Sequence, residues 1–391
     1  MNLLMYGAGS IGRGFIGPLF AQAGYEAVFV DVDRRIIGAL NSRRAYRYTV
    51  VTREKSYDIE VFGVRGVDGT DEAAVIDEIA SCDIMATSLG ASALQKVAPV
   101  IARGFSQRMQ KSGQPLNLLI CENLKDSAHT LRGWLERALP EDGRALLKEK
   151  CGLVEAAIGR MVPAAPENAG DPLHITVEEY GFLPVDKDAF VCNPPDIPML
   201  VPYSPFSFYE ERKLYLHNMG HAVCAYLGML CGFETIAEAI ANSAVRLLTQ
   251  SAMTESAAML SVKYKIPFPQ IFDHAEDLLM RFGNAALGDT CERVGRDPMR
   301  KIAAGDRLAG ALCQCAAHGI RPVYIALGYA AALRNLTGDA VRAGEIARDT
   351  GKLGEGQAKL AAELFMLLDS PMPGILEQAE RIKKKLRGDI V

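Results

Sequence analysis

The sequence predicts two domains of different class: an α/β domain built on a doubly wound parallel sheet, followed by an all-α domain. Three observations indicate this division. Short apolar runs alternate with helical patterns over the first half of the chain, and the first run ends in a glycine-rich turn. A proline-rich stretch at 193–205 interrupts the pattern, because proline cannot continue a helix or a central strand. After it, apolar residues recur at helical spacing almost to the end. We therefore expect domains at 1–195 and 196–391.

The composition is that of an ordinary globular protein of two or three domains, with 391 residues, 49% hydrophobic and 23% charged. The net charge of −4 gives no basic excess, so nucleic acid is not an expected partner. We expect a cytoplasmic protein without a membrane segment, because the chain shows neither a basic leader nor an apolar run near 18 residues. The nine cysteines are scattered without a C-x-x-C pair, which favours reduced thiols over disulfides or a structural zinc site.

The first predicted elements are a strand at 2–6, the motif GAGSIG and a helix at 11–23. Gly7, Gly9 and Gly12 stand in G-x-G-x-x-G register, which suits a tight turn, a close approach of the backbone to a pyrophosphate, and close packing of helix on strand. The phosphates would lie at the helix N-terminus, where free N–H groups and the helix dipole favour negative charge. This pattern predicts a Rossmann-type dinucleotide site. The predicted cofactor-binding residues are Gly7, Ala8, Gly9, Ser10, Ile11, Gly12, Asp31 and Ser88.

A second buried strand is predicted at 27–30 and ends at Asp31, about twenty residues after the glycines. A carboxylate at this position accepts hydrogen bonds from the ribose hydroxyls of the adenosine. It would also repel a 2′-phosphate, so NAD is predicted rather than NADP. Arg34 and Arg35 follow, and they would either accommodate a 2′-phosphate or begin the next helix on its exposed face.

The rest of the first domain alternates between strands and helices. Residues 46–51 and 57–64 read as a β-hairpin, which we interpret as an insertion in the winding. The winding then continues with strands at 83–87 and 116–121 and with a helix at 91–109. Two further strands are predicted at 152–154 and 173–178.

The strand at 116–121 ends at Glu122 and Asn123. Ligands of open α/β sheets bind beyond the carboxyl ends of the strands, so both side chains are well placed for function. Asparagine is also common in simple turns, so a purely structural role for Asn123 stays open.

Residues 208–231 are predicted to form one long helix that carries polar side chains on an otherwise apolar surface. In a regular α-helix, His217, His221 and Asn218 would lie about 40°, 80° and 140° round from Lys213. Four groups that exchange protons or hydrogen bonds would then share one flank. The same pattern is also compatible with a solvated stripe, or with core histidines bonded to backbone carbonyls.

Together with a dinucleotide site, this helix indicates a dehydrogenase. Lys213 is the predicted base for the alcohol proton, since a partly desolvated lysine gives up its proton more easily. Asn123 and Asn218 would donate amide N–H groups to the substrate oxygen and stabilise its developing charge. His221 would hold the lysine or a neighbouring hydroxyl.

Metal binding is the competing chemistry for this helix. The string HNMGH has the histidine spacing of the zinc hydrolases, but Asn218 stands where their catalytic glutamate would be. A third ligand would have to come from elsewhere, and the chain has six histidines in all. We therefore prefer the lysine mechanism and predict no metal.

The second domain also contains helices predicted at 235–261 and 268–282 and a basic segment, RVGRDPMRKIAAGDR, at 293–307. This segment is either a solvated turn between helices or an anion site facing the cofactor. The predicted substrate-binding residues are Arg160, Arg281, Asn284, Arg300, Lys301 and Arg307.

The chain resembles the polyol-specific long-chain dehydrogenases over nearly its whole length, most closely those that act on mannitol 1-phosphate. The similar segments are GAGSIGRGFIG, ALPED, VEAAIGRMVP, KLYLHNMGHAVCAYLG and ERVGRDPMRKIAAGDRL. The resemblance implies that Lys213 is the general acid/base, that Asn123 and Asn218 clamp the oxyanion, and that His221 orients the substrate. It also implies NAD, no metal, a monomer, and interconversion of D-mannitol 1-phosphate and D-fructose 6-phosphate.

The chain departs from this family at two places. Gly159 stands where relatives carry an aspartate near the substrate hydroxyls, with Glu155 as a nearby substitute, and YGFLPV at 180–185 lacks an expected tryptophan. Relatives that reduce fructuronate or tagaturonate, or oxidise free mannitol, share the four catalytic residues, so these substrates stay open. A decayed NAD-binding sensor is the non-enzyme alternative, and the presence of all four residues argues against it.

Overall fold

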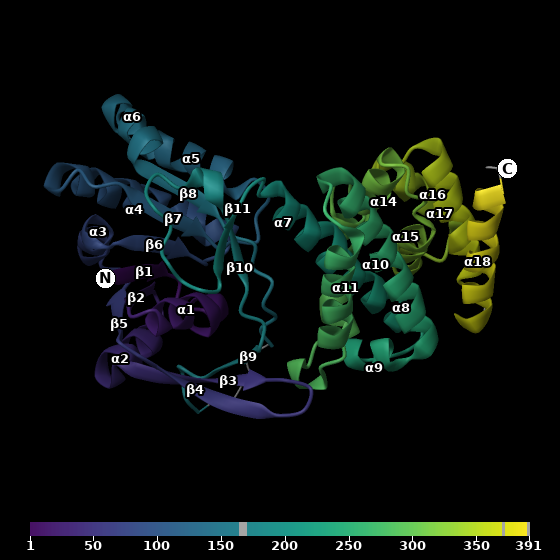
Figure 1. Ribbon diagram of the computed structural model, residues 1–391, viewed down its shortest axis with the longest axis horizontal. Helices are drawn as coiled ribbons and strands as arrows, with labels where there is room; N and C mark the ends of the chain where they lie inside the picture. The colour runs from purple at the N-terminus through teal and green to yellow at the C-terminus, as the bar shows by residue number, and fades with distance from the viewer. Residues whose placement is uncertain (164–169, 370–371, 389–391) are drawn as a thin grey trace. The chain divides into compact units, whose positions relative to one another are not determined.

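The computed structural model describes residues 1–163, 170–369 and 372–388. The chain divides into two compact units, Met1–Ser207 and Phe208–Val391 (Figure 1). The sequence placed a boundary earlier, at 195/196, and the point at which independently folding domains separate stays a prediction. In the described part of the chain, no helix combines the length and the apolar character needed to cross a membrane.

The first unit is built on a six-stranded parallel sheet with strand order β5-β2-β1-β6-β7-β8 (Figure 1). Its strands are β1 (Asn2–Tyr6), β2 (Glu26–Asp31), β5 (Val64–Asp68), β6 (Ile84–Thr87), β7 (Leu116–Ile120) and β8 (Cys151–Glu155). The winding reverses between β1 and β6, as in the doubly wound folds that bind dinucleotides at that point. The predicted fold class is confirmed.

Helices cover both faces of this sheet. They are η1 (Gly12–Ile16), α1 (Gly17–Gln22), α2 (Arg34–Arg43), α3 (Glu72–Ser81), α4 (Ala91–Lys111), α5 (Ser127–Ala138) and α6 (Glu141–Lys150). Alternate residues of β1 belong to two separate cores: Leu3 and Met5 share one with η1, α1 and α2, whereas Leu4 and Tyr6 share the other with α3 to α6. Burial on both faces explains why the strands read as continuous apolar runs.

The predicted hairpin is formed by β3 (Ala45–Val51) and β4 (Ser56–Phe62), which pair antiparallel. It is part of a larger structure, because β9 (Ile175–Glu178) pairs with β3 in parallel. The Tyr46 hydroxyl donates to the carbonyl of Arg13 at 2.6 Å. A Cβ at Gly14 would lie 2.7 Å from Val177 Cγ1, so glycine permits the close approach of η1 to β9. The hairpin therefore packs on the helix that follows the glycine motif.

Two predicted segments of the first unit are wrong in part. The hairpin does not extend to residue 64, because the chain turns at Gly63, which has φ of +69°, and then enters the main sheet as β5. The proline-rich stretch is not free of sheet, since β11 (Leu200–Tyr203) pairs in parallel with β10 (Leu183–Asp186). Both strands of a two-stranded sheet are edge strands, where Pro202 is tolerated.

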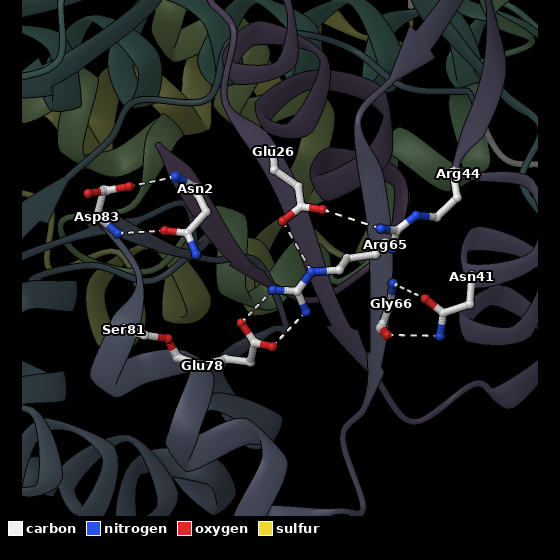
Figure 2. A network of polar contacts seen from close by, with 9 residues as sticks. All are labelled: Asn2, Glu26, Asn41, Arg44, Arg65, Gly66, Glu78, Ser81 and Asp83. Atoms are coloured by element: carbon white, nitrogen blue, oxygen red, sulfur yellow. Dashed lines mark hydrogen bonds and ion pairs between the residues drawn. The ribbon is translucent and has the colours of Figure 1, made fainter.

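A polar network ties the main sheet together at the amino-terminal ends of its strands (Figure 2). The guanidinium of Arg65 donates to both oxygens of Glu78, at 2.6 and 2.8 Å, and to Glu26 at 3.2 Å. Asn2 and Asp83 exchange two hydrogen bonds of 2.6 and 2.9 Å. Bidentate, charge-assisted contacts of this kind hold a fixed geometry. They stabilise the sheet at the amino-terminal ends of its strands, while the glycine motif lies at the carboxyl-terminal ends.

The second unit consists of helices. They are α7 (Ser207–Glu211), η3 (Arg212–Asn218), α8 (Met219–Leu230), α9 (Ile236–Ala241), α10 (Ser243–Tyr264), α11 (Phe268–Phe282), η4 (Ala285–Leu287), α12 (Cys291–Gly295), α13 (Pro298–Lys301), α14 (Arg307–Ala317), α15 (Val323–Leu336), α16 (Ala340–Asp349), α17 (Glu355–Leu367) and α18 (Met372–Gly388). Helix α8 is buried over most of its length and packs against α10 and α15. A Cβ at Gly328 would lie 2.3 Å from Val223 Cγ2, so α15 approaches α8 closely at this glycine.

The predicted helix at 268–282 is confirmed as α11, whereas the single helix predicted at 235–261 is wrong. The chain is extended at Asn242 (ψ 125°), which separates α9 from α10. The Asn242 side chain accepts hydrogen bonds from the backbone N–H groups of Ala244 and Val245. Asparagine is a strong N-cap residue, and this capping outweighs the continuous helical spacing of the flanking apolar residues.

Candidate active site

The glycine motif lies at the point where the winding of the sheet reverses. Gly7 follows β1, and Ser88 follows β6 and donates its backbone N–H to the carbonyl of Tyr6 at 2.9 Å. Gly7 has φ of +109°, and a Cβ there would lie 2.4 Å from the carbonyl oxygen of Ser88. Only glycine fits this turn, and the structure brings the two predicted cofactor residues together.

Gly9 and Gly12 differ in what surrounds them. A Cβ at Gly12 would lie 2.1 Å from the carbonyl oxygen of Gly7, whereas a Cβ at Gly9 would meet no atom within 4 Å. Gly12 is therefore needed for the packing of the chain on itself. Gly9 faces open space beside the first turn of the helix, so the backbone is accessible there, as the pyrophosphate of a dinucleotide requires.

The chain's own carboxylates occupy two other helix N-termini at the carboxyl-terminal ends of the strands. Glu122 accepts from the backbone N–H groups of Leu89 and Gly90, at 2.9 and 2.7 Å, at the start of α4. Glu155 accepts from the hydroxyl of Ser127 at 2.7 Å and from a backbone N–H at the start of α5. These side chains satisfy the positive ends of the two helix dipoles, so the glycine-motif helix is the better place for an external anion.

Asp31 connects the end of β2 to the glycine loop. Its Oδ2 accepts from the backbone N–H of Ala8 at 2.8 Å, and its Oδ1 accepts from that of Asp33 at 3.0 Å. Each carboxylate oxygen has a second lone pair, so these bonds leave room for the predicted ribose contacts. Asp31 therefore shapes the loop in addition to any contact with the cofactor.

The two arginines after β2 are paired with carboxylates. Arg34 Nε lies 3.0 Å from Asp68 Oδ2, and Arg35 Nη2 lies 2.8 Å from Asp33 Oδ2, with both arginines exposed. Asp68 is also the register partner of Asp31 in the sheet. A 2′-phosphate would thus approach three carboxylates with both cations already engaged. Of the two roles considered for these arginines, the structure favours the exposed start of the next helix.

The contacts of Arg160 hold the backbone of the first unit. Its Nη1 donates to the carbonyl of Gly14 at 2.8 Å, and its other nitrogens donate to the carbonyls of Tyr180 and Glu179. The guanidinium lies 4.8 Å from the centre of the Phe15 ring. Burial is the main cause that lowers the pKa of Arg160. A contact of Arg160 with substrate stays a prediction.

At position 159, where the resemblance places an aspartate in relatives, a side chain would have to displace the ring of Tyr180. A Cβ at Gly159 would lie 2.9 Å from Cε1 of Tyr180, so the tyrosine ring fills the region that a side chain would need. Glu155, the suggested substitute, is engaged at the start of α5. The ring of Tyr180 thus occupies the space beside Gly159, and Glu155 is already bonded elsewhere.

The helix of the second unit that carries Lys213 is not a regular α-helix over its whole length. The long helix predicted at 208–231 is present as an unbroken helical stretch, but its regular α geometry is wrong, because η3 is a π-helix between α7 and α8. Hydrogen bonds in a π-helix run from residue i to i+5, so the angles expected between Lys213, His217 and Asn218 do not apply. The hydroxyl of Ser256 donates to the carbonyl of Tyr215 at 2.7 Å and thereby supports this segment. Long π segments are rare, and π turns are frequent at functional sites.

The two histidines of this helix lie against Phe282. The ring of His221 stacks on that of Phe282, with centroids 4.6 Å apart and an interplanar angle of 10°. His217 lies 5.9 Å from the same ring and 6.3 Å from His221. Burial, followed by the charges of Arg293 and Arg307, lowers the pKa of His221 to about 3. Burial also lowers the pKa of His217 well below its usual value, so both imidazoles are neutral at working pH.

Part of the predicted basic segment is buried near His221. Lys301 is 4% exposed, and burial, followed by the charges of Arg307 and Arg300, lowers its pKa to about 8. Arg307 pairs with Asp306 at 2.9 Å. A fully solvated turn is therefore excluded for this part of the segment. The cations that act on the pKa of His221, in decreasing order, are those of Arg293, Arg307, Arg281 and Lys301.

The other predicted site residues lie as follows. Arg300 is exposed at the end of α13. Asn284 is buried, and its side-chain oxygen accepts from the backbone N–H of Ala286 at 3.2 Å. Asn123 is exposed in the turn after β7 and belongs to the first unit, so its place beside Lys213 stays a prediction.

Sequence reasoning missed Phe282 and Asp289. Asp289 Oδ2 lies 3.6 Å from Nε2 of His221 and comes from the connection between η4 and α12. His221 and Asp289 are 68 residues apart in the chain, so no helical or strand periodicity links them in the sequence. The only local signal for Asp289 is that it belongs to a group of polar residues between Arg281 and Arg293.

The described residues contain no group of three or more histidine, cysteine, aspartate or glutamate side chains arranged to hold a metal ion. We predict that prolonged incubation with EDTA leaves the initial rate unchanged, because a lysine mechanism requires no Lewis acid. The measurement compares rates before and after dialysis against EDTA, with metal content determined on the same samples. Activity that is lost on chelation and restored by zinc would support the metal mechanism instead.

Two family models match the chain. The model described as the mannitol dehydrogenase Rossmann domain matches residues 1–199, and that of the mannitol dehydrogenase C-terminal domain matches residues 206–366. Among solved structures, a ternary complex of Pseudomonas fluorescens mannitol 2-dehydrogenase with NAD and D-mannitol is similar at 16% identity, with a TM-score of 0.75 over 98% of this chain and 94% of that one. A substrate-free D-sorbitol dehydrogenase is similar at 16% identity, with a TM-score of 0.72 over 99% and 93%. The chain belongs to the mannitol dehydrogenase family of NAD-dependent polyol oxidoreductases.

Proposed function

We propose that this protein is an NAD-dependent dehydrogenase that interconverts D-mannitol 1-phosphate and D-fructose 6-phosphate. The observation that supports a phosphorylated substrate is the cluster of cations near His221, in the same unit as Lys213. Arg281, Arg293, Lys301 and Arg307 all lower the pKa of His221. Asp289 and Asp306, the partners of Arg293 and Arg307, balance part of this positive charge, and a phosphate dianion would balance the rest. Arginine binds phosphate through paired hydrogen bonds.

The chain's residues would divide the chemistry as follows. When bound, NAD supplies the hydride acceptor. Lys213 takes the hydroxyl proton through Nζ, and the amides of Asn218 and Asn123 donate to the oxygen that becomes the carbonyl. His221 is neutral, so it can hold a substrate hydroxyl without adding a further positive charge. Ketone reduction follows the same steps in reverse, with the Lys213 ammonium as the acid.

The direct test is a spectrophotometric screen with NADH and four ketoses: fructose 6-phosphate, fructose, fructuronate and tagaturonate. The proposal expects fructose 6-phosphate to have the highest kcat/KM. A preference for a keto-uronate would favour the uronate reductases of this family, whose substrates carry a carboxylate in place of the phosphate. A preference for fructose would favour a dehydrogenase for free mannitol. NADH binding without turnover of any sugar would identify a cofactor sensor.

We predict that NADH is preferred to NADPH and that Asp31→Ala narrows this preference by roughly tenfold. A 2′-phosphate near the Asp31 carboxylate experiences charge repulsion, for which about 1.4 kcal/mol is a reasonable scale at a partly exposed site. Asp31 also holds the backbone of Ala8, so the variant should bind both cofactors less well. The measurement is therefore the ratio of kcat/KM for the two cofactors.

Asp83→Asn is the matched control for this prediction. Asp83 also lies beside the main sheet, but at the amino-terminal ends of the strands, where it forms hydrogen bonds with Asn2. Its replacement should leave the cofactor ratio unchanged. Equal efficiency of the unmodified enzyme with both cofactors would contradict the role given to Asp31.

For the anion site, we predict that Arg300→Ala raises KM for fructose 6-phosphate by roughly threefold to tenfold, with little change in kcat. A charge that contacts a remote phosphate contributes uniform binding, and an exposed charge contributes modestly. KM for unphosphorylated fructose should hardly change. Arg296→Ala is the control, because Arg296 is an exposed arginine of the same segment. Equal losses on both sugars would show that Arg300 is structural.

A further inference from the structure

The surroundings of His221 include a carboxylate that the mechanism above does not use. Asp289 has a side chain that is 10% exposed, and its Oδ2 lies 3.6 Å from Nε2 of His221. That nitrogen is buried, and within the described part of the chain it has no hydrogen-bond partner. A buried polar atom without a hydrogen-bond partner costs free energy. A carboxylate just beyond hydrogen-bond distance therefore suggests that the two atoms form a bond in another state of the protein.

Both side chains are held by their surroundings. The carbonyl of Asp289 accepts from the backbone N–H of Ile236 at 2.9 Å, and the next residue, Thr290, forms a β-bridge with Thr235. The second carboxylate oxygen of Asp289 pairs with Arg293. On the other side, the stacking of His221 on Phe282 restricts rotation of the imidazole. The contact is thus built by four separate segments of the second unit, which contain His221, Thr235, Phe282 and Asp289.

The protonation state of His221 makes this contact important. A neutral imidazole carries its proton on one nitrogen only, and the partner of that nitrogen decides which tautomer is present. With the proton on Nε2, the imidazole donates towards Asp289 and leaves Nδ1 as an acceptor. With the proton on Nδ1, the lone pair of Nε2 would face the carboxylate, which is unfavourable.

We propose that Asp289 is a positioning residue that fixes His221 as the Nε2–H tautomer, so that Nδ1 accepts a hydrogen bond from a substrate hydroxyl. The substrate contact rests on the function proposed above, whereas the tautomer does not. A separation of 3.6 Å is longer than a hydrogen bond, and a shift of roughly half an ångström would form it. Hydrogen bonds of active sites are often long in the free enzyme and shorten in the complex.

Asp289→Asn tests the proposal, because the amide keeps the shape of the carboxylate but can present an N–H to Nε2. In the serine protease triad, the equivalent change leaves the geometry intact and stabilises the wrong tautomer. Nitrogen chemical shifts in ¹⁵N-histidine-labelled protein report the tautomer directly. The chain has six histidines, and a spectrum of His221→Gln assigns the relevant signals. We expect Nε2–H in the unmodified enzyme and a shift towards Nδ1–H in Asp289→Asn.

The kinetic expectation is a fall in kcat of roughly 10–100-fold for Asp289→Asn, with the dissociation constant of NADH unchanged. Residues that orient a metal-bound histidine through its other ring nitrogen have effects in this range when they are replaced, and we expect the same of Asp289. Two variants separate this role from others. Glu238→Ala removes the half of the α9 capping box in which Glu238 accepts from the backbone N–H of Thr235, beside the same loop, and should lower Tm without changing the tautomer or kcat. Arg293→Met removes the other partner of Asp289 and should leave the tautomer as Nε2–H.

Three results would overturn the proposal: Nδ1–H in the unmodified enzyme, the same tautomer in Asp289→Asn, or a change of tautomer in Arg293→Met equal to that in Asp289→Asn. The spectrum of the unmodified enzyme, assigned with His221→Gln, does not depend on Asp289→Asn, so it remains decisive if Asp289→Asn folds poorly. If no sugar is turned over, the proposed function fails, while the NMR result still decides the role of Asp289.

Discussion

Replacement of Lys213 by alanine is expected to lower kcat by roughly 10²–10⁴-fold, the usual contribution of a positioned general acid or base. Lys213 lies in the π-helical segment η3, and its charge adds a small part to the lowering of the pKa of His217, which burial mainly causes. It therefore lies in the same cluster as the buried histidines. NADH binding should persist in the variant, because the glycine motif belongs to the first unit.

The pH dependence of the two directions should identify this lysine. Alcohol oxidation requires the neutral amine and ketone reduction requires the ammonium, so kcat should rise with pH for oxidation and fall for reduction. The histidines cannot produce this profile, because the pKa of His221 is lowered to about 3 and that of His217 is also well below its usual value. Lys301, with a pKa lowered to about 8, should lose its charge near that pH and raise KM for sugar phosphates. Separate profiles of kcat and KM distinguish the two lysines.

Lys263→Ala is a suitable control for Lys213→Ala. Lys263 is a partly buried lysine of the same unit, bonded to Glu211 at 2.7 Å and to Gln314 at 3.0 Å. Its loss should lower Tm and leave the pH profile of kcat unchanged. An added primary amine should restore some activity to Lys213→Ala only. Near-normal kcat and an unchanged profile in Lys213→Ala would mean that the proton passes through another group, with His221 next to be tested.

Gly9→Ala is expected to weaken NADH binding by roughly tenfold to a hundredfold without lowering Tm. The added methyl group meets no protein atom within 4 Å, so the fold accommodates it. It would instead occupy the space through which the pyrophosphate approaches the backbone. Forcing a methyl group into a filled site costs about 1–3 kcal/mol, which corresponds to this loss of affinity.

Gly12→Ala is the matched comparison, and it is expected to lower the stability of the fold as well as NADH binding. Its methyl carbon would lie 2.1 Å from the carbonyl oxygen of Gly7, so the helix must move away from the turn. Tm should fall by several degrees, and NADH binding should weaken because the loop is displaced. Calorimetric titration with NADH and thermal unfolding of both variants provide the test. Unchanged NADH affinity in Gly9→Ala would show that the pyrophosphate binds elsewhere.

The class of the first domain and its glycine motif were predictable from the sequence because their determinants are local. A buried parallel strand requires an unbroken apolar run, and the turn after it requires glycine at a fixed spacing. The structure shows both, in β1 and at Gly7, with Asp31 at the end of β2. The helical class of the second unit was predictable for the same reason, since amphipathic spacing is a property of consecutive residues.

Only the tertiary structure decided the details of the second unit's candidate site. The π-helical geometry of η3 depends on packing and on partners such as Ser256, which lies 41 residues from the carbonyl of Tyr215 that it supports. The placement of His221 between Phe282 and Asp289 joins side chains more than 60 residues apart in the chain. The burial of Lys301 within a segment that reads as a charged turn has the same origin. Contacts between distant segments leave no periodic signal in the sequence, because their geometry arises only when the helices pack.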